Sequence, residues 1–315
     1  MSILAVEITG HLILMLCFLI ALIHIIMNRG RLQRNLRSSR ILFWTTVNSS
    51  IAFSVFNGFH LAVLIFQGTG SGISPWIDLV SEYPLIIAQT LIIGYLVMNK
   101  IVVPRSVKPM RILAIGAHPD DLEIAVGATL AKLHDAGHLV SGLVATRGER
   151  GGNELLRPGE AQKGAGFLGL DHLYVYDFCD TRLSEDEVPL IQVIEAQIRE
   201  LKPDIIFTHS VNDIHQDHQA VHEATLRAAR NKSTVLCYES PSTTQAFQPN
   251  LFVDVSDYVG VKISAIKLHW DQRNKPYMRE EQIRGKLAFR GGQARLDYAE
   301  GFEVIRMSFD LMGVN

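Results

Sequence analysis

The sequence lacks several features that would assign it directly to a class. Its 315 residues hold 30 basic and 32 acidic side chains, and a net charge of −2 gives no reason to expect a nucleic-acid partner. Three cysteines, Cys17, Cys179 and Cys237, form no spaced set and are interpreted as buried, reduced thiols. We find no internal repeat and no low-complexity tract. The turn after the strand predicted at Ile112–Ile115 lacks Gly-x-Gly-x-x-Gly, which disfavours a dinucleotide site.

Hydrophobic residues, in contrast, are abundant at 48%, and they are concentrated before Lys100. Three apolar stretches, at residues 8–27, 41–66 and 83–103, are each long enough for the roughly 20-residue helix that crosses a bilayer core. No cleavage pattern follows the first stretch, so an uncleaved helix is favoured over a signal peptide. We therefore predict a multi-pass integral membrane protein whose transmembrane region is residues 1–103.

The distribution of basic residues predicts the orientation of this region. Arginines lie between the first two stretches and basic residues follow the third, whereas residues 67–83 contain none. Basic loops face the cytoplasm, so the amino terminus is expected outside and the catalytic part in the cytoplasm. If the third stretch, which Gln89, Asn99 and Lys100 dilute, does not span, the catalytic part would lie on the opposite side.

Residues 104–110 contain two prolines, break the helical periodicity and are predicted to be a linker. The remaining residues, 111–315, are a usual size for one domain. Strands are predicted at Ile112–Ile115, Leu139–Ala145, Leu173–Tyr176, Ile205–Thr208 and Val235–Tyr238. Helices are predicted at Leu122–Ala136, Glu160–Leu168, Val188–Leu201 and Asp217–Arg230. This alternation predicts an α/β fold, a Rossmann-like parallel sheet with helices on both faces, with ligands at the carboxyl ends of the strands.

Two polar clusters follow predicted strands. His118–Glu123 follows the first strand, and His209–His218 follows the fourth. A single histidine at such a place is most often a polar loop residue, and an aspartate at a helix start is most often an N-cap. Two clusters of imidazoles and carboxylates at two strand ends instead predict a catalytic zinc site with two histidines and one carboxylate. Fe(II) uses the same ligands, so this alternative stays open.

Four motifs resemble those of one known family. They are Ala-His-Pro-Asp-Asp-Leu-Glu at Ala117–Glu123, Thr-Arg-Gly-Glu-Arg-Gly at Thr146–Gly151, Arg157-x-x-Glu160, and Asp213-x-His215-x-Asp217-His218. Together they resemble the PIG-L/LmbE family of zinc-dependent N-deacetylases over residues 111 to about 230. Gln216 departs from the family, in which many members have proline at this position.

The resemblance implies roles for the clustered side chains. His118, Asp121 and His218 would hold zinc, or another divalent metal, and Asp120 would be the general base. His215, oriented by Asp217, would stabilise the oxyanion and protonate the leaving amine. As an alternative or an additional role, Asp217 would cap the following helix.

The resemblance also implies a substrate-binding arginine, Arg157, and the local sequence adds Arg147, Arg150 and Glu123 as further candidate site residues. Arg157 would hold the sugar or an attached acidic group, unless it is an exposed charge paired with Glu160. Arg147 and Arg150 lie in a glycine-rich loop that is suited to phosphate, although solvated loop charges are the commoner case. Glu123 would support the metal ligands or favour the helix start.

The expected function is a metal-dependent hydrolase that removes an N-acetyl group from an amino sugar of the N-acetylglucosamine type. The predicted membrane region favours a lipid-linked substrate at the cytoplasmic face, with the bilayer as a second partner. Two alternatives remain: the same chemistry on a soluble sugar conjugate or nucleotide sugar, and a non-catalytic membrane protein that binds sugar.

Overall fold

The computed structural model describes residues 108–232 and 234–308, residue 106, and isolated positions between residues 23 and 62. The chain divides into two compact units, Met1–Ile101 and Val102–Asn315, and all elements discussed below belong to the second. Most positions of the predicted segments 8–27 and 41–66, the whole of segment 83–103, and residues 104, 105 and 107 of the predicted linker lie outside the described residues. The predicted domain boundaries therefore stay predictions.

Strands and helices alternate from residue 111 to residue 238, as the sequence predicts. The strands are β1 (Arg111–Gly116), β2 (Leu139–Thr146), β3 (His172–Phe178), β4 (Ile205–His209), β5 (Val235–Tyr238), β6 (Leu251–Asp254) and β7 (Ala299–Arg306). The helices are α5 (Asp121–Ala125), α6 (Gly127–Asp135), α7 (Arg157–Leu168), α8 (Glu187–Leu201), α9 (Gln216–Ala228), α10 (Val259–Ile266) and α11 (Glu280–Ala294), with short 3₁₀ turns at Ser256–Tyr258 and Pro276–Met278.

The seven strands form one sheet in the order β3-β2-β1-β4-β5-β7-β6. The first five pair in parallel, which confirms the predicted parallel arrangement for this part of the sheet. β7 runs antiparallel to both β5 and β6, so the sheet is mixed at this end. The strand order reverses between β1 and β4, and the carboxyl ends of these two strands are where such folds place ligands.

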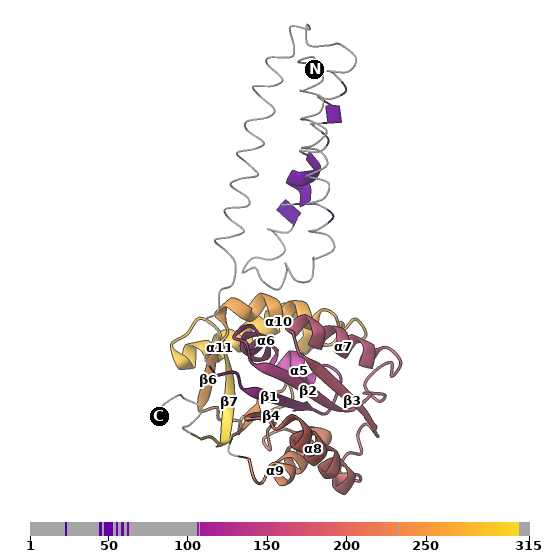
Figure 1. Ribbon diagram of the computed structural model, residues 1–315, viewed down its shortest axis with the longest axis vertical. Helices are drawn as coiled ribbons and strands as arrows, with labels where there is room; N and C mark the ends of the chain where they lie inside the picture. Colours follow the sequence, from indigo (N-terminus) through magenta and orange to yellow (C-terminus); the bar gives the residue numbers. More distant parts are fainter. Residues whose placement is uncertain are drawn as a thin grey trace. The chain divides into compact units, whose positions relative to one another are not determined.

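Helices cover both faces of the sheet, as predicted (Figure 1). α8 and α9 lie on one face, and α6, α7, α10 and α11 lie on the other. β1 shows why two layers are needed, because all of its residues after Arg111 are buried. Leu113 and Ile115 pack in the core with α8 and α9, whereas Ile112 and Ala114 pack in the core with α5 and α6. A central strand that is apolar on both sides must be covered on both sides.

The predicted helix Leu122–Ala136 is divided into α5 and α6 at Val126, whose φ of −129° is not helical. The start of α6 is stabilised by a residue that lies far along the chain. Glu300 of β7 accepts hydrogen bonds from the backbone N–H groups of Ala128 (3.2 Å) and Thr129 (2.7 Å). These N–H groups have no partner within their own helix, so a distant carboxylate supplies what a local cap otherwise would.

The prediction of a multi-pass membrane protein is wrong for the residues that the structure describes, because none of their helices is both long and apolar enough to cross a bilayer. The longest of them, α8 and α11, have 15 residues each. At 1.5 Å per residue this is about 22 Å, which is short of the hydrocarbon core of about 30 Å. α8 also buries only one side, including Leu190 and Ile194, against the sheet. The predicted location of the catalytic part at the cytoplasmic face of a membrane rested on the same assignment and is withdrawn with it.

Two adjacent glycines near the end of α11 test the packing of this helix. A Cβ on Gly291 would lie 2.6 Å and 2.7 Å from the carbonyl oxygens of Asp297 and Leu296, whereas a Cβ on Gly292 would meet no atom within 4 Å. We expect Gly291→Ala to lower the free energy of unfolding by about 2 kcal/mol, because backbone must move. Gly292→Ala should be neutral or stabilising by up to about 1 kcal/mol. Urea denaturation measures both, and equal effects would contradict this packing.

Candidate active site

The two predicted clusters meet at the carboxyl ends of β1 and β4. His118 follows β1 by two residues, and Asp121 begins α5. His218 lies in the first turn of α9, beyond the loop that follows β4. Because β1 and β4 are neighbours in the sheet, residues about 100 positions apart in the chain enter the same site.

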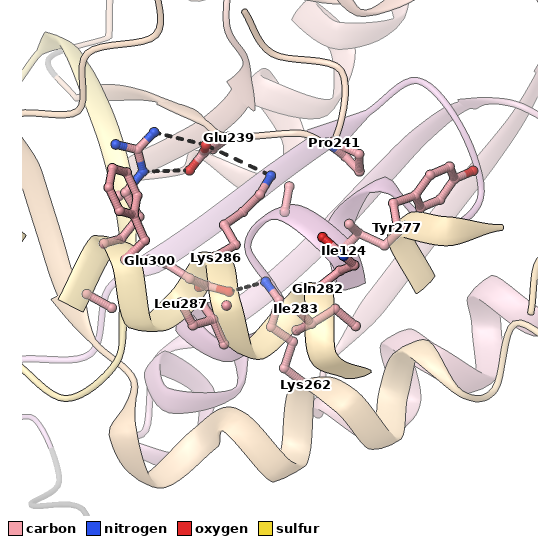
Figure 2. Close-up of a pocket in the computed structure, with 16 residues that line it drawn as sticks. Ile124, Glu239, Pro241, Lys262, Tyr277, Gln282, Ile283, Lys286, Leu287 and Glu300 are labelled. Atoms are coloured by element: carbon pink, nitrogen blue, oxygen red, sulfur yellow. Dashed lines mark hydrogen bonds and ion pairs between the residues drawn. The ribbon is translucent and has the colours of Figure 1, made fainter. Parts of the chain in front are cut away.

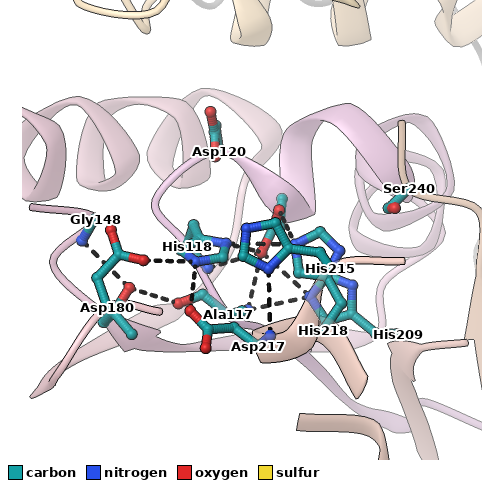
Figure 3. Close-up of polar contacts among 12 residues, drawn as sticks. Ala117, His118, Asp120, Gly148, Asp180, His209, His215, Asp217, His218 and Ser240 are labelled. Carbon is teal, nitrogen blue, oxygen red and sulfur yellow. Dashed lines mark hydrogen bonds and ion pairs between the residues drawn. The ribbon is translucent and has the colours of Figure 1, made fainter. Parts of the chain in front are cut away.

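Three predicted metal ligands converge on one point, and Figure 3 shows two of them, His118 and His218. Nδ1 of His118 lies 3.5 Å from Oδ2 of Asp121 and 3.3 Å from Nε2 of His218. Nε2 of His218 lies 3.5 Å from Oδ1 of Asp121. All three side chains are buried, and they form one of three groups among the described residues whose donor atoms are close enough to share a metal.

The remaining nitrogen of each ring is held by a carboxylate. Nε2 of His118 lies 3.1 Å from both Asp180 and Asp217, and Nδ1 of His218 lies 2.9 Å from Asp213. A carboxylate only accepts hydrogen bonds, so these nitrogens carry protons and the converging nitrogens are the ones that can offer lone pairs to a cation. Carboxylates of this kind orient metal-binding histidines. The donor set therefore fits a divalent cation, and it suits Zn²⁺ and Fe²⁺ equally.

The charges in the cluster agree with this fit. Burial opposes the charged form of Asp121, but the adjacent His218 and His209 outweigh burial and hold its pKa well below the usual value. Burial likewise lowers the pKa of His218, but Asp121 and Asp213 raise it to about 9. Protonated imidazole thus balances the buried carboxylates, and a bound cation would replace these protons. Metal binding should therefore release protons and weaken at low pH.

Asp120 lies beside this cluster and is bound to a different partner. Nη2 of Arg157 lies 3.2 Å from Oδ1 of Asp120, and Nη1 donates to the carbonyl of Gly148 at 2.6 Å. Both side chains are at least 95% buried. Gly148 has φ +71°, and a Cβ there would overlap the guanidinium of Arg157. The glycine-rich loop therefore makes the space in which Arg157 holds Asp120.

The predicted orientation of His215 by the Asp217 carboxylate needs correction. The backbone N–H of Asp217 donates to Nδ1 of His215 at 3.2 Å, so the His215 ring caps α9. The Asp217 carboxylate instead binds His118 and the backbone N–H groups of Thr181 (2.7 Å) and Leu183 (3.2 Å). The N–H groups in the first turn of a helix have no acceptor within the helix, and the His215 ring, just before α9, supplies one. Burial, then His118 and His218, lower the pKa of His215.

A cavity of about 330 Å³ opens over these residues. The residues that line it include His118, Asp120, Asp121, Arg150, Arg157, Asp180, His215, His218, Ser242, Lys275 and Tyr277. Arg150 also donates its backbone N–H to Asp180 at 2.8 Å. Arg147 is exposed, reaches the carbonyl of Glu154 at 3.5 Å and does not line the cavity. Of the three predicted substrate-binding arginines, two therefore lie at the cavity and one does not.

Sequence reasoning missed two residues of the site and misplaced one. His209 is fully buried, stacks on His218 with ring centroids 3.8 Å apart, and lies 3.2 Å from Asp121. Its position at the start of the second cluster, His209–His218, could have indicated that it belongs to the site. Asp180 follows β3, and no local pattern distinguishes it. Glu123, predicted to support the ligands, pairs instead with buried His269 at 3.4 Å.

Comparison with known proteins identifies the family of this chain. A family model described as PIG-L, GlcNAc-PI de-N-acetylase, matches residues 113–229. The uncharacterized deacetylase YaiS of Escherichia coli K12 is 35% identical over 180 residues, which cover 55% of this chain and 97% of that protein. The chain belongs to the PIG-L family. The diacetylchitobiose deacetylase of Thermococcus kodakarensis is 28% identical to this PIG-L member over 62% of this chain and 83% of that protein.

Solved structures share the fold of this PIG-L domain. The conserved protein TT1542 from Thermus thermophilus superposes with a TM-score of 0.57 at 25% identity, over 63% of this chain and 96% of that one. The N,N'-diacetylchitobiose deacetylase from Pyrococcus horikoshii, complexed with an inhibitor, gives a TM-score of 0.56 at 23% identity, over 63% and 85%. Because the Pyrococcus horikoshii structure is only 23% identical, its similarity shows a shared fold and nothing more.

The Asp213 contact to His218 generates a test of metal binding. Asp213→Asn removes the charge that orients the ring, and we expect affinity for Zn²⁺, measured by competition with a chromogenic chelator, to fall about 10- to 100-fold. Asp177→Asn removes an exposed carboxylate of β3 and is the matched control. Equal affinities of the two variants would contradict the assigned role of Asp213.

The close approach of Gly148 to Arg157 generates a second test. Gly148→Ala should displace the guanidinium from Asp120 and lower kcat about 10- to 100-fold, because a misplaced catalytic group loses its geometry. Gly159→Ala, in α7, adds a methyl group that meets no atom within 4 Å and serves as the control. Acetate release from an N-acetylated amino sugar measures both, and full activity of Gly148→Ala would count against this arrangement.

Proposed function

We propose that this chain hydrolyses the acetamido group of an N-acetylated amino sugar, releasing acetate and the free amine. One observation carries the proposal: three metal donors, His118, Asp121 and His218, line the same cavity as the carboxylate of Asp120. Deacetylases of diacetylchitobiose and of a 2-acetamido-2-deoxyglucopyranoside are among the similar proteins, which supports an acetamido sugar as substrate.

His118, Asp121 and His218 would hold the divalent metal, with zinc as the first candidate and Fe²⁺ as the second. When bound, the metal supplies Lewis-acid chemistry, activating water and polarising the amide carbonyl. Asp180, Asp213 and Asp217 hold the two imidazole rings so that their free nitrogens stay directed at one point. These three carboxylates act through the ligands and are positioning residues.

Asp120 is proposed as the general base. Arg157 holds its Oδ1, which leaves Oδ2 to take a proton from the attacking water. The guanidinium fixes the orientation of the carboxylate, and its own burial keeps it from rotating away. We therefore assign Arg157 a positioning role in addition to the substrate contact that the sequence predicts, since it also lines the cavity.

His215 is proposed to stabilise the oxyanion. Its Nδ1 accepts the N–H of Asp217, so the neutral ring carries its proton on Nε2. Such a ring donates a hydrogen bond to the oxygen on which charge develops. To protonate the leaving amine, His215 would need a second proton on Nδ1, which already accepts the N–H of Asp217. We therefore propose that Asp120, which has received a proton from the attacking water, protonates the amine instead.

The lipid carrier that the sequence favours depended on the membrane localisation, and it is not part of this proposal. The non-catalytic alternative is less well supported, because the donor set, its carboxylate partners and Asp120 are all present around one cavity. A sugar-binding protein would have no use for a buried base held by an arginine. Acetate release distinguishes the two.

Asp120→Asn tests the base directly. Asparagine is isosteric but takes no proton, and we expect kcat for acetate release from N-acetylglucosaminides to fall about 10²- to 10⁴-fold. Zinc affinity should change little, because Asp120 is not among the converging donors. Asp177→Asn should retain wild-type turnover. Unchanged kcat in Asp120→Asn would refute the base assignment, and activity that survives complete metal removal would refute the metal-dependent mechanism.

A further inference from the structure

A second cavity of about 410 Å³ adjoins the catalytic one, and Figure 2 shows residues that line it. Three residues, Ile124, Pro241 and Tyr277, line both cavities. Ile124 belongs to α5, which begins with the ligand Asp121, and Pro241 belongs to the loop after β5. The two spaces are therefore neighbours with shared walls, and a molecule larger than one sugar ring could occupy both.

The walls of this second cavity are mostly apolar and come largely from α11. Ala125, Ile283, Leu287 and Phe289 contribute apolar surface. Gly285 also lines it, and a Cβ at this position would meet no atom within 4 Å. Most of this lining lies beyond residue 229, where the match to the family model ends.

The charges that line the second cavity do not balance. Lys262 pairs with Glu300, and both are buried. Arg290 binds both oxygens of Glu239, at 2.8 Å and 2.9 Å. These two pairs leave the ammonium group of Lys286 as the surplus charge among the described lining residues.

Lys286 has only weak compensation. Its Nζ donates to the carbonyl of Ser240 at 3.1 Å and lies 3.9 Å from Glu239, whose carboxylate Arg290 already occupies. Its side chain is 37% exposed, so the cavity can reach it. Burial, together with nearby Lys262 and Arg290, lowers the pKa of Lys286 despite the attraction of Glu239. An arriving anion would relieve this unfavourable environment.

We infer that this second cavity binds the part of the substrate beyond the amino sugar, and that this part is apolar next to the sugar and carries an anionic group that pairs with Lys286. The inference depends on the proposed deacetylation, because the acetamido group must lie over His118, Asp121 and His218. The walls near Ile124 and Pro241 face the apolar part, and Lys286 meets the carboxylate or phosphate. Lys286 is thus a specificity residue and takes no part in the hydrolysis.

The test uses pairs of N-acetylglucosaminides whose aglycone chain, in three lengths and both anomers, ends in a carboxylate or in its methyl ester. For at least one length, we expect wild-type kcat/KM to favour the acid over the ester about tenfold, as a hydrogen bond between charged groups allows. Lys286→Gln should bring this ratio close to one. Arg284→Gln removes a charge from the same helix outside the cavity and should keep the wild-type ratio.

A second pair of variants tests the space itself. Gly285→Leu places a side chain in the second cavity, and we expect it to lower kcat/KM of the longest acid relative to the shortest about tenfold. Gly292→Leu, on the same helix, adds the same side chain outside the cavity and should leave this ratio unchanged. Both variants replace a helical glycine, so their effects on helix propensity are matched.

Calorimetric binding of the same acid and ester pairs separates this inference from the proposed function. A preference for the acid that Lys286→Gln abolishes and Arg284→Gln retains supports the anion site, even if no acetate is released. Acetate release without any preference for the acid at any length supports the deacetylase and overturns the anion site. Equal losses in Lys286→Gln and Arg284→Gln would also overturn it.

Discussion

The contact between the Asp217 carboxylate and Nε2 of His118 is the interaction on which the rest of the site depends. It joins the two polar clusters, 99 residues apart in the chain, across the point where the strand order reverses. The same carboxylate accepts the N–H groups of Thr181 and Leu183 and so holds the loop after β3. Because this carboxylate is fully buried, its charge is compensated only while all of these donors stay in place.

The site is organised as two carboxylate systems with different tasks. Asp180, Asp213 and Asp217 face imidazole rings and direct the free ring nitrogens to a common point. Asp120 faces an arginine instead, and Arg157 reaches it only because Gly148 has no side chain. This separation suits the proposed roles of the neighbouring aspartates, Asp120 as base and Asp121 as metal ligand, since each is held by its own partner.

The region beyond β5 adds what the family motifs do not contain. α11 and the loop after β5 form a second cavity next to the catalytic one, and its surplus cation, Lys286, comes from α11. Members of a family can keep the hydrolytic groups and change the residues that meet the remainder of the substrate. The placement of Lys286 outside the catalytic cluster fits this division between chemistry and selectivity.

The sequence by itself determined the five parallel strands, most of the helices and the places of the two polar clusters, because local periodicity and strand-end polarity are short-range signals. The individual assignments of His118, Asp120, Asp121 and His218 came from the resemblance to the PIG-L family motifs. Tertiary structure decided the remainder. The break between α5 and α6 depends on Glu300, the antiparallel β7 depends on pairing with β5, and Asp180 reaches His118 from a loop with no distinctive pattern. Apolar runs before residue 104 predicted membrane spans from their length alone, and no helix of the described residues is both long and apolar enough to cross a bilayer. Contacts between residues far apart in the chain leave little trace in local sequence, and for this reason the sequence did not predict that the Asp217 carboxylate binds His118 and Thr181.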